Sequence, residues 1–307
     1  MLKKSGATVF VCAKFASVTA KSFTTLLSGQ SKDGGLVERG NNKTLSGSVT
    51  VILWQKAALP LRYAFRTVSY VAFALNQRHY RYIFLLTHMR AGSTLFGHIL
   101  ASNPDVAGAG ELWQPYLVEA DLDNVVLRTC EYLRKPILTQ KYVVDSICHN
   151  DIEVSDEVLS SDCVHKCIIL IREPRGALKS LMGREWPQSG AATYYANRID
   201  RLTQYGLFLG KRALFIEYGD LLDRGEPTLA AISKFLGLNV PLTSNYMLRR
   251  TTQRNGDPSE NIKIGRIVRT AGHRFVLDED LASAASRAYD SCRDQLRETT
   301  CQVDDFT

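Results

Sequence analysis

The sequence predicts an α/β domain with a mostly parallel sheet, and three observations support that prediction. Short continuous apolar runs at 82–86, 167–171 and 213–216 are typical of strands that are covered on both faces. The first two runs are each followed by a polar turn, and helical segments separate all three. Strands that alternate with helices form parallel sheets with helices on both faces, which gives a three-layer sandwich. Ligands of such sheets bind at the carboxyl ends of the strands.

Length and composition fit one large domain with extensions. The chain has 307 residues, of which 45% are apolar and 22% charged, and this excludes a disordered or fibrous protein. The formal net charge of +7 fits a polyanionic nucleotide as ligand. No recognition helix, zinc finger or RNA-binding aromatic motif is evident, so we expect no nucleic-acid partner. Seven scattered cysteines, an odd number, indicate a reducing compartment, and we expect a cytoplasmic location.

Residues 1–50 are predicted to be a basic tail and a flexible linker. The first 27 residues contain four lysines and no acidic residue, which is the composition of some transit peptides. A plain disordered tail and an upstream start codon are the alternatives. Residues 28–48 are rich in Gly, Ser, Lys and Asn, as linkers are.

Residues 51–78 form an apolar segment that we expect to be amphipathic. Lys56, Pro60, Arg62 and Arg66 interrupt it, whereas a membrane-spanning helix needs about 20 mostly apolar residues. Packing on the main domain, 79–300, is the first interpretation. Peripheral membrane contact through 51–75 is the second, because basic residues flank the apolar face.

A phosphate-binding turn is predicted directly after the strand at 82–86. A cation, a glycine and two hydroxyls stand at the start of a helix that should end at Ser102, before Asn103-Pro104. Backbone N–H groups and the helix dipole favour a phosphate there. The common triphosphate loop, G-x-x-x-x-G-K-[ST], needs a glycine and a lysine that are missing, so ATP is not the first choice. The residues of the turn are Arg90, Ala91, Gly92, Ser93 and Thr94.

This turn and a second strand-turn-helix segment together resemble sulfotransferases that use 3′-phosphoadenosine 5′-phosphosulfate (PAPS). In that family a basic residue precedes small-Gly-Ser/Thr-Ser/Thr in the 5′-phosphosulfate loop, as Arg90 does here. The family also places Arg at the end of a later strand and Ser eight positions on, both on the 3′-phosphate, and Arg172 and Ser180 have this spacing. Arginine at a strand end and serine two helical turns later can converge on one phosphate. The resemblance implies a P-loop-like sulfotransferase fold with PAPS as cofactor.

Two further segments extend the resemblance over roughly 82–272. The third strand continues into Tyr-Gly-Asp-Leu-Leu, and the next helix ends in Phe-Leu-Gly-Leu, both similar to the family, although Gly219 replaces its usual Glu. Lys263 and Gly265 resemble the Lys-x-Gly loop that closes over the cofactor. Glu260 stands where many relatives have an arginine, so the closure differs in detail.

Sulfuryl transfer to a hydroxyl needs a base for the acceptor proton and a cation at the transferring group. Arg90 is assigned the cation. Glu111 follows the second predicted strand, on the same sheet edge as the phosphate turn, and is the first candidate base. N-acetylglucosamine 6-O-sulfotransferases have Glu-Pro-Leu-Trp at a similar place, where this chain has Glu111-Leu112-Trp113-Gln114-Pro115. The resemblance favours a carbohydrate or glycolipid acceptor, but the displaced proline leaves the acceptor open. His149 is the rival base, because cytosolic sulfotransferases place a catalytic His before the 3′-phosphate strand.

Two other functions stay open at this point. A P-loop kinase that uses ATP would share the strand-loop-helix unit. A non-catalytic nucleotide-binding protein on the same fold would account for the departures at Gly219 and Glu260.

The remaining histidines and cysteines carry weaker predictions. His88 could contact phosphate, and His98 is expected to pack on the helix after the turn. The pattern Cys163-Val-His165-Lys-Cys167 places three metal-ligand types on one strand face. No second ligand pair with zinc spacing lies nearby, so no metal site is predicted.

Other elements follow from local patterns. Gln114 to Arg134 should contain a helix, and 141–147 is a strand candidate. An acidic connection is expected at 151–162, a helix at 194–209 and a last helix at 278–297.

Overall fold

The computed structural model describes residues 64–73, 75, 79–249, 252, 259–269 and 275–307. The chain divides into two units, Met1–Gln77 and Arg78–Thr307. In the first unit, residues 64–73 and 75 are helical. The predicted tail and linker at 1–50, and most of the apolar segment at 51–78, lie outside the described residues. None of the described helices is long and apolar enough to cross a membrane.

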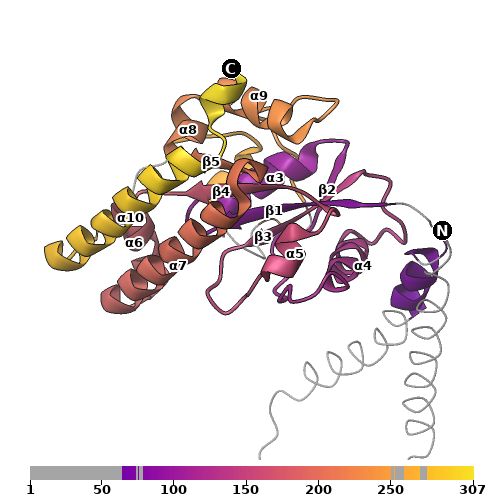
Figure 1. Cartoon of the computed structure of the whole chain (residues 1–307), viewed down its shortest axis with the longest axis horizontal. Coiled ribbons are helices and arrows are strands. Elements are labelled where there is room, and N and C mark those ends of the chain that lie inside the picture. Colours follow the sequence, from indigo (N-terminus) through magenta and orange to yellow (C-terminus); the bar gives the residue numbers. More distant parts are fainter. Residues whose placement is uncertain (1–63, 74, 76–78, 250–251, 253–258, 270–274) are drawn as a thin grey trace, which may run out of the picture. The chain divides into compact units, whose positions relative to one another are not determined.

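The second unit is built on a five-stranded parallel sheet with the order β2-β3-β1-β4-β5, which confirms the predicted α/β class (Figure 1). Leu86 of the central strand pairs with Ile147, and Thr87 pairs with Leu170. The carboxyl ends of three neighbouring strands are therefore level. The strands are β1 (Arg81–Thr87), β2 (Val106–Gly108), β3 (Tyr142–Ile147), β4 (Val164–Ile171) and β5 (Ala213–Glu217).

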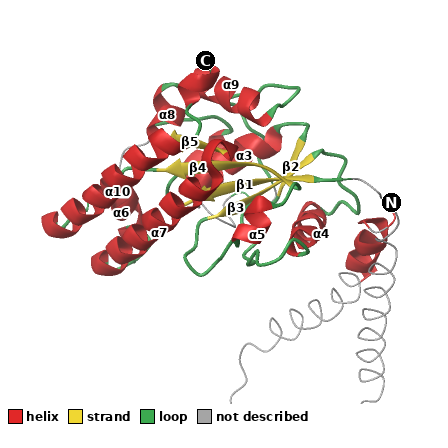
Figure 2. Ribbon diagram, in the orientation of Figure 1, coloured by secondary structure: helices red, strands yellow, loops and turns green. Residues whose placement is uncertain are grey.

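Helices connect these strands, as Figure 2 shows. The helix after the phosphate turn ends at Ser102 as predicted, and Asn103 caps it. The acidic connection before β4 contains a short helix that Ser155 caps, which the sequence analysis did not foresee. The α-helices are α3 (Ser93–Ser102), α4 (Asp121–Leu133), α5 (Asp156–Ser160), α6 (Pro174–Met182), α7 (Gln188–Leu209), α8 (Tyr218–Asp223), α9 (Gly225–Leu236) and α10 (Glu279–Thr299), and the 3₁₀ helices are η1 (Gly210–Arg212), η2 (Glu260–Ile264) and η3 (Val303–Phe306).

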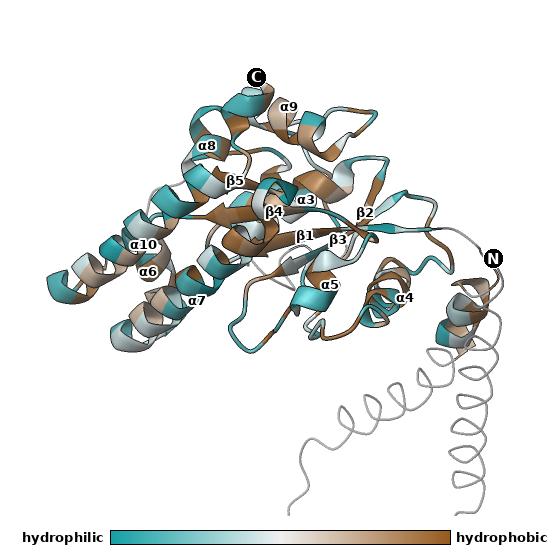
Figure 3. Ribbon diagram, viewed as in Figure 1, coloured by the Kyte–Doolittle hydropathy of each residue, from teal (hydrophilic) through white to brown (hydrophobic). Residues whose placement is uncertain are grey.

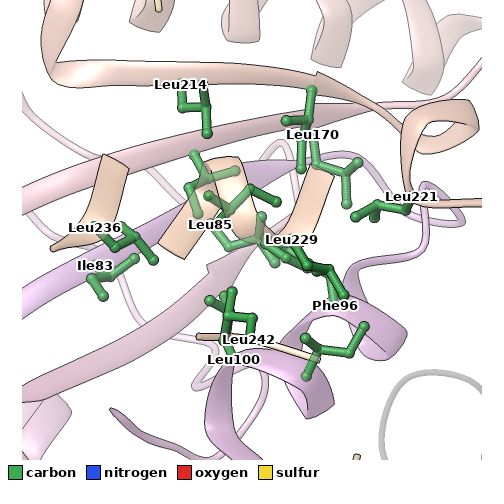
Figure 4. Close-up of a cluster of buried hydrophobic side chains, with 14 of the residues drawn as sticks. Ile83, Leu85, Phe96, Leu100, Leu170, Leu214, Leu221, Leu229, Leu236 and Leu242 are labelled. Atoms are coloured by element: carbon green, nitrogen blue, oxygen red, sulfur yellow. The ribbon is translucent and has the colours of Figure 1, made fainter. Parts of the chain in front are cut away.

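Alternate side chains of the central strand enter two different cores. Ile83 and Leu85 belong to a buried cluster with residues of α3, α8 and α9, which Figure 4 shows in close-up. Phe84 points to the opposite face and meets Tyr116 edge to face at 4.9 Å. Because both faces of the strand are covered, its sequence is a continuous apolar run, and the strands are mostly hydrophobic in Figure 3.

Helix α7 covers the second face of the sheet and is itself covered by α10. Gly206 allows this close packing, since a Cβ there would lie 2.0 Å from Leu296 of α10 and 3.3 Å from Ile169 of β4. Asp278 caps the start of α10, and its carboxylate accepts from the N–H groups of Asp280 and Leu281. Together with the first core, this gives helices on both faces of the sheet, the predicted three layers.

Candidate functional site

The turn between β1 and α3 lies at the carboxyl edge of the sheet. Two of its residues have left-handed backbone conformations, Arg90 at φ 68° and Gly92 at φ 94°. A Cβ on Gly92 would lie 2.5 Å from the ring of Tyr218, so only glycine fits there. Gly92 is also the N-cap of α3, and no described side chain caps this helix terminus. The turn therefore presents the positive end of the α3 dipole beside two hydroxyls, those of Ser93 and Thr94.

The two segments that the sequence assigns to phosphate binding contact each other. The Nε atom of Arg90 donates to the hydroxyl of Ser180 at 2.8 Å. A nitrogen of the Arg172 guanidinium donates to the carbonyl oxygen of Arg90 at 3.2 Å. The same guanidinium lies 4.8 Å above the ring of Tyr218. Two arginines and a nearly buried serine from distant parts of the chain thus form one group.

A pocket opens over this group. Its floor contains Arg90, Gly92, Ser93, Thr94 and Arg172, while Ala91 and Ser180 are buried behind it. Sequence reasoning assigned none of the other lining residues to the site, although Tyr218 begins the Tyr-Gly-Asp-Leu-Leu segment. The other lining residues are Leu95, Tyr218, Tyr246, Ser259, Asn261, Ile262, Arg266 and Val268.

Lys263 and Gly265 flank this wall without lining the pocket. The Lys263 ammonium pairs with Glu260 at 2.9 Å on an exposed turn. Gly265 has φ 74°, and its carbonyl accepts from the N–H of Tyr246 at 2.8 Å. Gly265 therefore fixes Tyr246 against the segment that supplies Arg266. Arg266, and not Lys263, is the basic residue of this segment that lines the pocket.

The two rival bases are neighbours. The Nε2 atom of His149 lies 3.4 Å from a carboxylate oxygen of Glu111, and both side chains are partly buried, at 13% and 17% exposure. The ring of Trp113 packs on the His149 ring, with centroids 3.8 Å apart. Trp113 has φ 52° and an exposed side chain, an uncommon backbone conformation for a bulky residue. Glu111 and His149 thus form one pair with an aromatic cover.

Buried Asp145 of β3 holds the segment that carries Glu111. Its carboxylate accepts from the N–H of Leu112 at 3.0 Å and from the Tyr116 hydroxyl. The N–H of Ser146 donates to the carbonyl of Gly110 at 3.3 Å. Burial raises the pKa of Asp145 to about 7, although these donors act in the opposite direction. The chain from Gly110 to Leu112 therefore follows the end of β3, which brings Glu111 beside His149.

Helix α7 connects this pair to the phosphate turn. The hydroxyl of Tyr194 donates to the Cys148 carbonyl at 2.5 Å and accepts from the Met89 N–H at 2.7 Å. Arg198 is fully buried and donates to the carbonyls of Thr87 at 2.7 Å and His149 at 3.1 Å. The ends of β1 and β3 are thereby fixed to one helix.

The structure places His88 and His98, the two histidines with weaker predictions, in different surroundings. His88 is fully buried, accepts from the Arg172 N–H through Nε2 and donates to the Met89 carbonyl through Nδ1, both at 2.9 Å. Burial lowers the pKa of His88 to about 4, so the ring is neutral at pH 7 and braces the two loops. His98 lies on α3 and is hydrogen-bonded to the Thr94 carbonyl at 2.8 Å.

The cysteines and histidine of β4 do not form a common group. His165 is hydrogen-bonded to the Leu236 carbonyl at 3.0 Å, and the Cys163 thiol donates to Glu119 at 3.5 Å. Cys167 is fully buried in the sheet.

Comparison with known proteins identifies a structural likeness but no family. No protein-family model matches the chain, and no curated protein matches it. Solved structures that resemble it include a mouse sulfotransferase, SULT7A1, complexed with PAP. The likeness has a TM-score of 0.39 and 14% sequence identity, and it covers 75% of this chain and 90% of the mouse protein. At that level the likeness carries no functional argument, so the function is argued from the site residues.

Proposed function

We propose that the chain is a sulfotransferase that moves the sulfuryl group of PAPS to an acceptor hydroxyl. The observation that carries this proposal is the contact between Arg90 and Arg172, which are 82 positions apart and line one pocket at the start of α3. Two arginines that converge from different loops suit a nucleotide phosphorylated at both ends.

The residues divide naturally between the two ends of the nucleotide. Arg90, Ser93, Thr94 and the N–H groups at the start of α3 would hold the 5′-phosphosulfate and stabilise charge on the leaving phosphate. Arg172 would hold the 3′-phosphate together with Ser180. Arg90 and Ser180 are already one hydrogen bond apart, so both ends of a compact nucleotide are within reach of the group.

The pair of Glu111 and His149 supplies the base. Tyr194 and Arg198 connect this pair to the turn that carries Arg90, so the pair and the turn lie at the same edge of the sheet. We assign proton removal from the acceptor hydroxyl to the pair as a unit, in which one member takes the proton and the other stabilises the resulting charge. Sulfuryl transfer of this kind depends on positioning and charge stabilisation.

A carbohydrate or glycolipid is the acceptor we favour. The exposed ring of Trp113 lies directly beside the base pair. Sugar rings have an apolar face that packs on aromatic side chains and hydroxyls that need a base at a fixed distance. A ring in this position would present one sugar hydroxyl to Glu111 and His149.

Isothermal titration of the full chain with 3′-phosphoadenosine 5′-phosphate tests the cofactor assignment. We expect binding of this nucleotide, and much weaker binding of 5′-AMP and ATP, because only the first carries the 3′-phosphate that Arg172 would bind. Preference for ATP would support a P-loop kinase instead. Binding without turnover toward any glycan acceptor, with PAPS as donor, would favour the non-catalytic nucleotide-binding protein.

A further inference from the structure

Three metal-ligating atoms meet beside the proposed acceptor site. Among the described residues, Glu111, Cys148 and His149 place a carboxylate oxygen, a thiol sulfur and an imidazole nitrogen within 4.8 Å of one another. The chain brings them together from two segments, the turn after β2 and the end of β3. The thiol of Cys148 is buried, whereas the other two side chains are partly exposed.

The separation of the carboxylate and imidazole atoms matches that of two ligands around a zinc ion. Zinc binds imidazole nitrogen and carboxylate oxygen at about 2.0–2.2 Å, and tetrahedral angles then place the two ligand atoms roughly 3.4 Å apart. The Glu111 oxygen and the His149 nitrogen are separated by 3.4 Å. One ion can therefore contact both without a change of backbone, and the sulfur, within 4.8 Å of each of them, is close enough to approach the ion as the third ligand.

The backbone under all three ligands is held in place. The N–H after Glu111 donates to Asp145, the Cys148 carbonyl accepts from Tyr194, and the His149 carbonyl accepts from Arg198. Sites that are fixed in this way need little reorganisation to bind an ion. The charges also suit a dication, since a carboxylate and a thiolate together neutralise it, while the Arg198 guanidinium is directed to carbonyl oxygens.

We propose that Glu111, Cys148 and His149 form a three-ligand site for a divalent ion of the zinc type, with its fourth position open to solvent. Binding would release the thiol proton of Cys148 to solvent as the sulfur–metal bond forms. An ion here would occupy both members of the base pair. An ion bound there would therefore inhibit sulfuryl transfer, an expectation that rests on the proposed function.

Cobalt binding to the full-length protein tests the site without any assay of turnover. Co²⁺ should bind with one equivalent per chain and give a near-ultraviolet thiolate-to-metal band together with the strong visible absorption of a tetrahedral site. Added Zn²⁺ should remove both signals. Absence of the thiolate band would overturn the proposal, whatever the protein's enzymatic activity.

Two ligand variants and one control variant locate the metal and distinguish the loss of a ligand from misfolding. Cys148→Ser should abolish the thiolate band, and Cys163→Ser, a matched change at a partly exposed cysteine elsewhere, should leave it unchanged. Because Cys148 is buried, His149→Gln provides a second test at a partly exposed position, with Zn²⁺ affinity reduced at least about 100-fold. Unchanged affinity in His149→Gln, or an equal loss in Cys163→Ser, would refute the site. Titration with 3′-phosphoadenosine 5′-phosphate on the same samples reports separately on the nucleotide pocket.

Discussion

Replacement of Arg172 by alanine tests the assignment of the two phosphate sites. The guanidinium lies at the carboxyl end of β4, lines the pocket and is 24% exposed, so a phosphate would contact it in a partly desolvated setting. A hydrogen bond to a charged group contributes about 1.5–3 kcal/mol. Loss of that contact should weaken binding of 3′-phosphoadenosine 5′-phosphate by about 10- to 150-fold.

The ligand provides the sharpest comparison for this variant. 5′-AMP lacks the 3′-phosphate, so its affinity should change by no more than about twofold when Arg172 is removed. Arg175→Ala is the matched protein control, because Arg175 lies on the same loop and helix but forms an exposed ion pair with Glu279. Isothermal titration of both variants with both nucleotides gives the four affinities.

One result would refute the reasoning. Arg172 also donates to the carbonyl of Arg90 and so supports the phosphate turn. If Arg172→Ala weakened 5′-AMP as strongly as 3′-phosphoadenosine 5′-phosphate, the residue would act by holding this turn, and its assignment to the 3′-phosphate would be wrong. Circular dichroism of the variant separates either outcome from unfolding.

Three further changes test the turn, the base and a buried histidine. Gly92→Ala should lower the free energy of unfolding by about 1–3 kcal/mol and weaken nucleotide binding, because the backbone there has φ 94° and the new Cβ would lie 2.5 Å from the Tyr218 ring. Gly97→Ala in α3 is the control: its Cβ would have no atom nearer than 3.7 Å, so stability and nucleotide binding should stay unchanged, or stability should rise slightly. Glu111→Gln should preserve nucleotide affinity and lower kcat by about 10²- to 10⁴-fold in a sulfate-transfer assay, and full activity would exclude this carboxylate as the base. Burial lowers the pKa of His88 to about 4 from its ordinary 6.5, so the free energy of unfolding should be highest above pH 6.5 and fall by about 3 kcal/mol as pH drops to 4. Urea unfolding of His88→Gln should lack that part of the pH dependence, and parallel profiles for the two proteins would contradict the assignment.

The strands and the phosphate turn could be predicted because their signals are local. A strand covered on both faces is a continuous apolar run, and β1 and β4 both have one. Gly92 and the proline after Asn103 mark the two ends of α3 in the sequence itself. The spacing of Arg172 and Ser180 follows from one strand end and two helical turns. These features need no knowledge of which segments become neighbours.

The pairing of Glu111 with His149 could not be predicted, because it depends on tertiary contacts. Strand β2 ends at Gly108, earlier than the strand expected before Glu111, and the chain beyond it is held by Asp145. A buried acid in a strand gives no sequence signal of which backbone N–H it will bind. The sequence therefore presented the two bases as alternatives, whereas the structure places them 3.4 Å apart.

Arg198 shows why the site is organised around strand ends that are far apart in sequence. Burial of an arginine costs several kcal/mol unless every donor finds an acceptor, and burial lowers the pKa of this guanidinium. Its donors reach the carbonyls of Thr87 and Ile147, the last residues of β1 and β3, and the carbonyl of His149, two residues beyond β3. The arginine donates to these carbonyls at the carboxyl edge of the sheet and so connects the phosphate turn with the base pair. A buried charge on α7 is compatible with a stable fold because its donors have acceptors. An apolar side chain could fill the same volume, but it could not hydrogen-bond to the ends of β1 and β3.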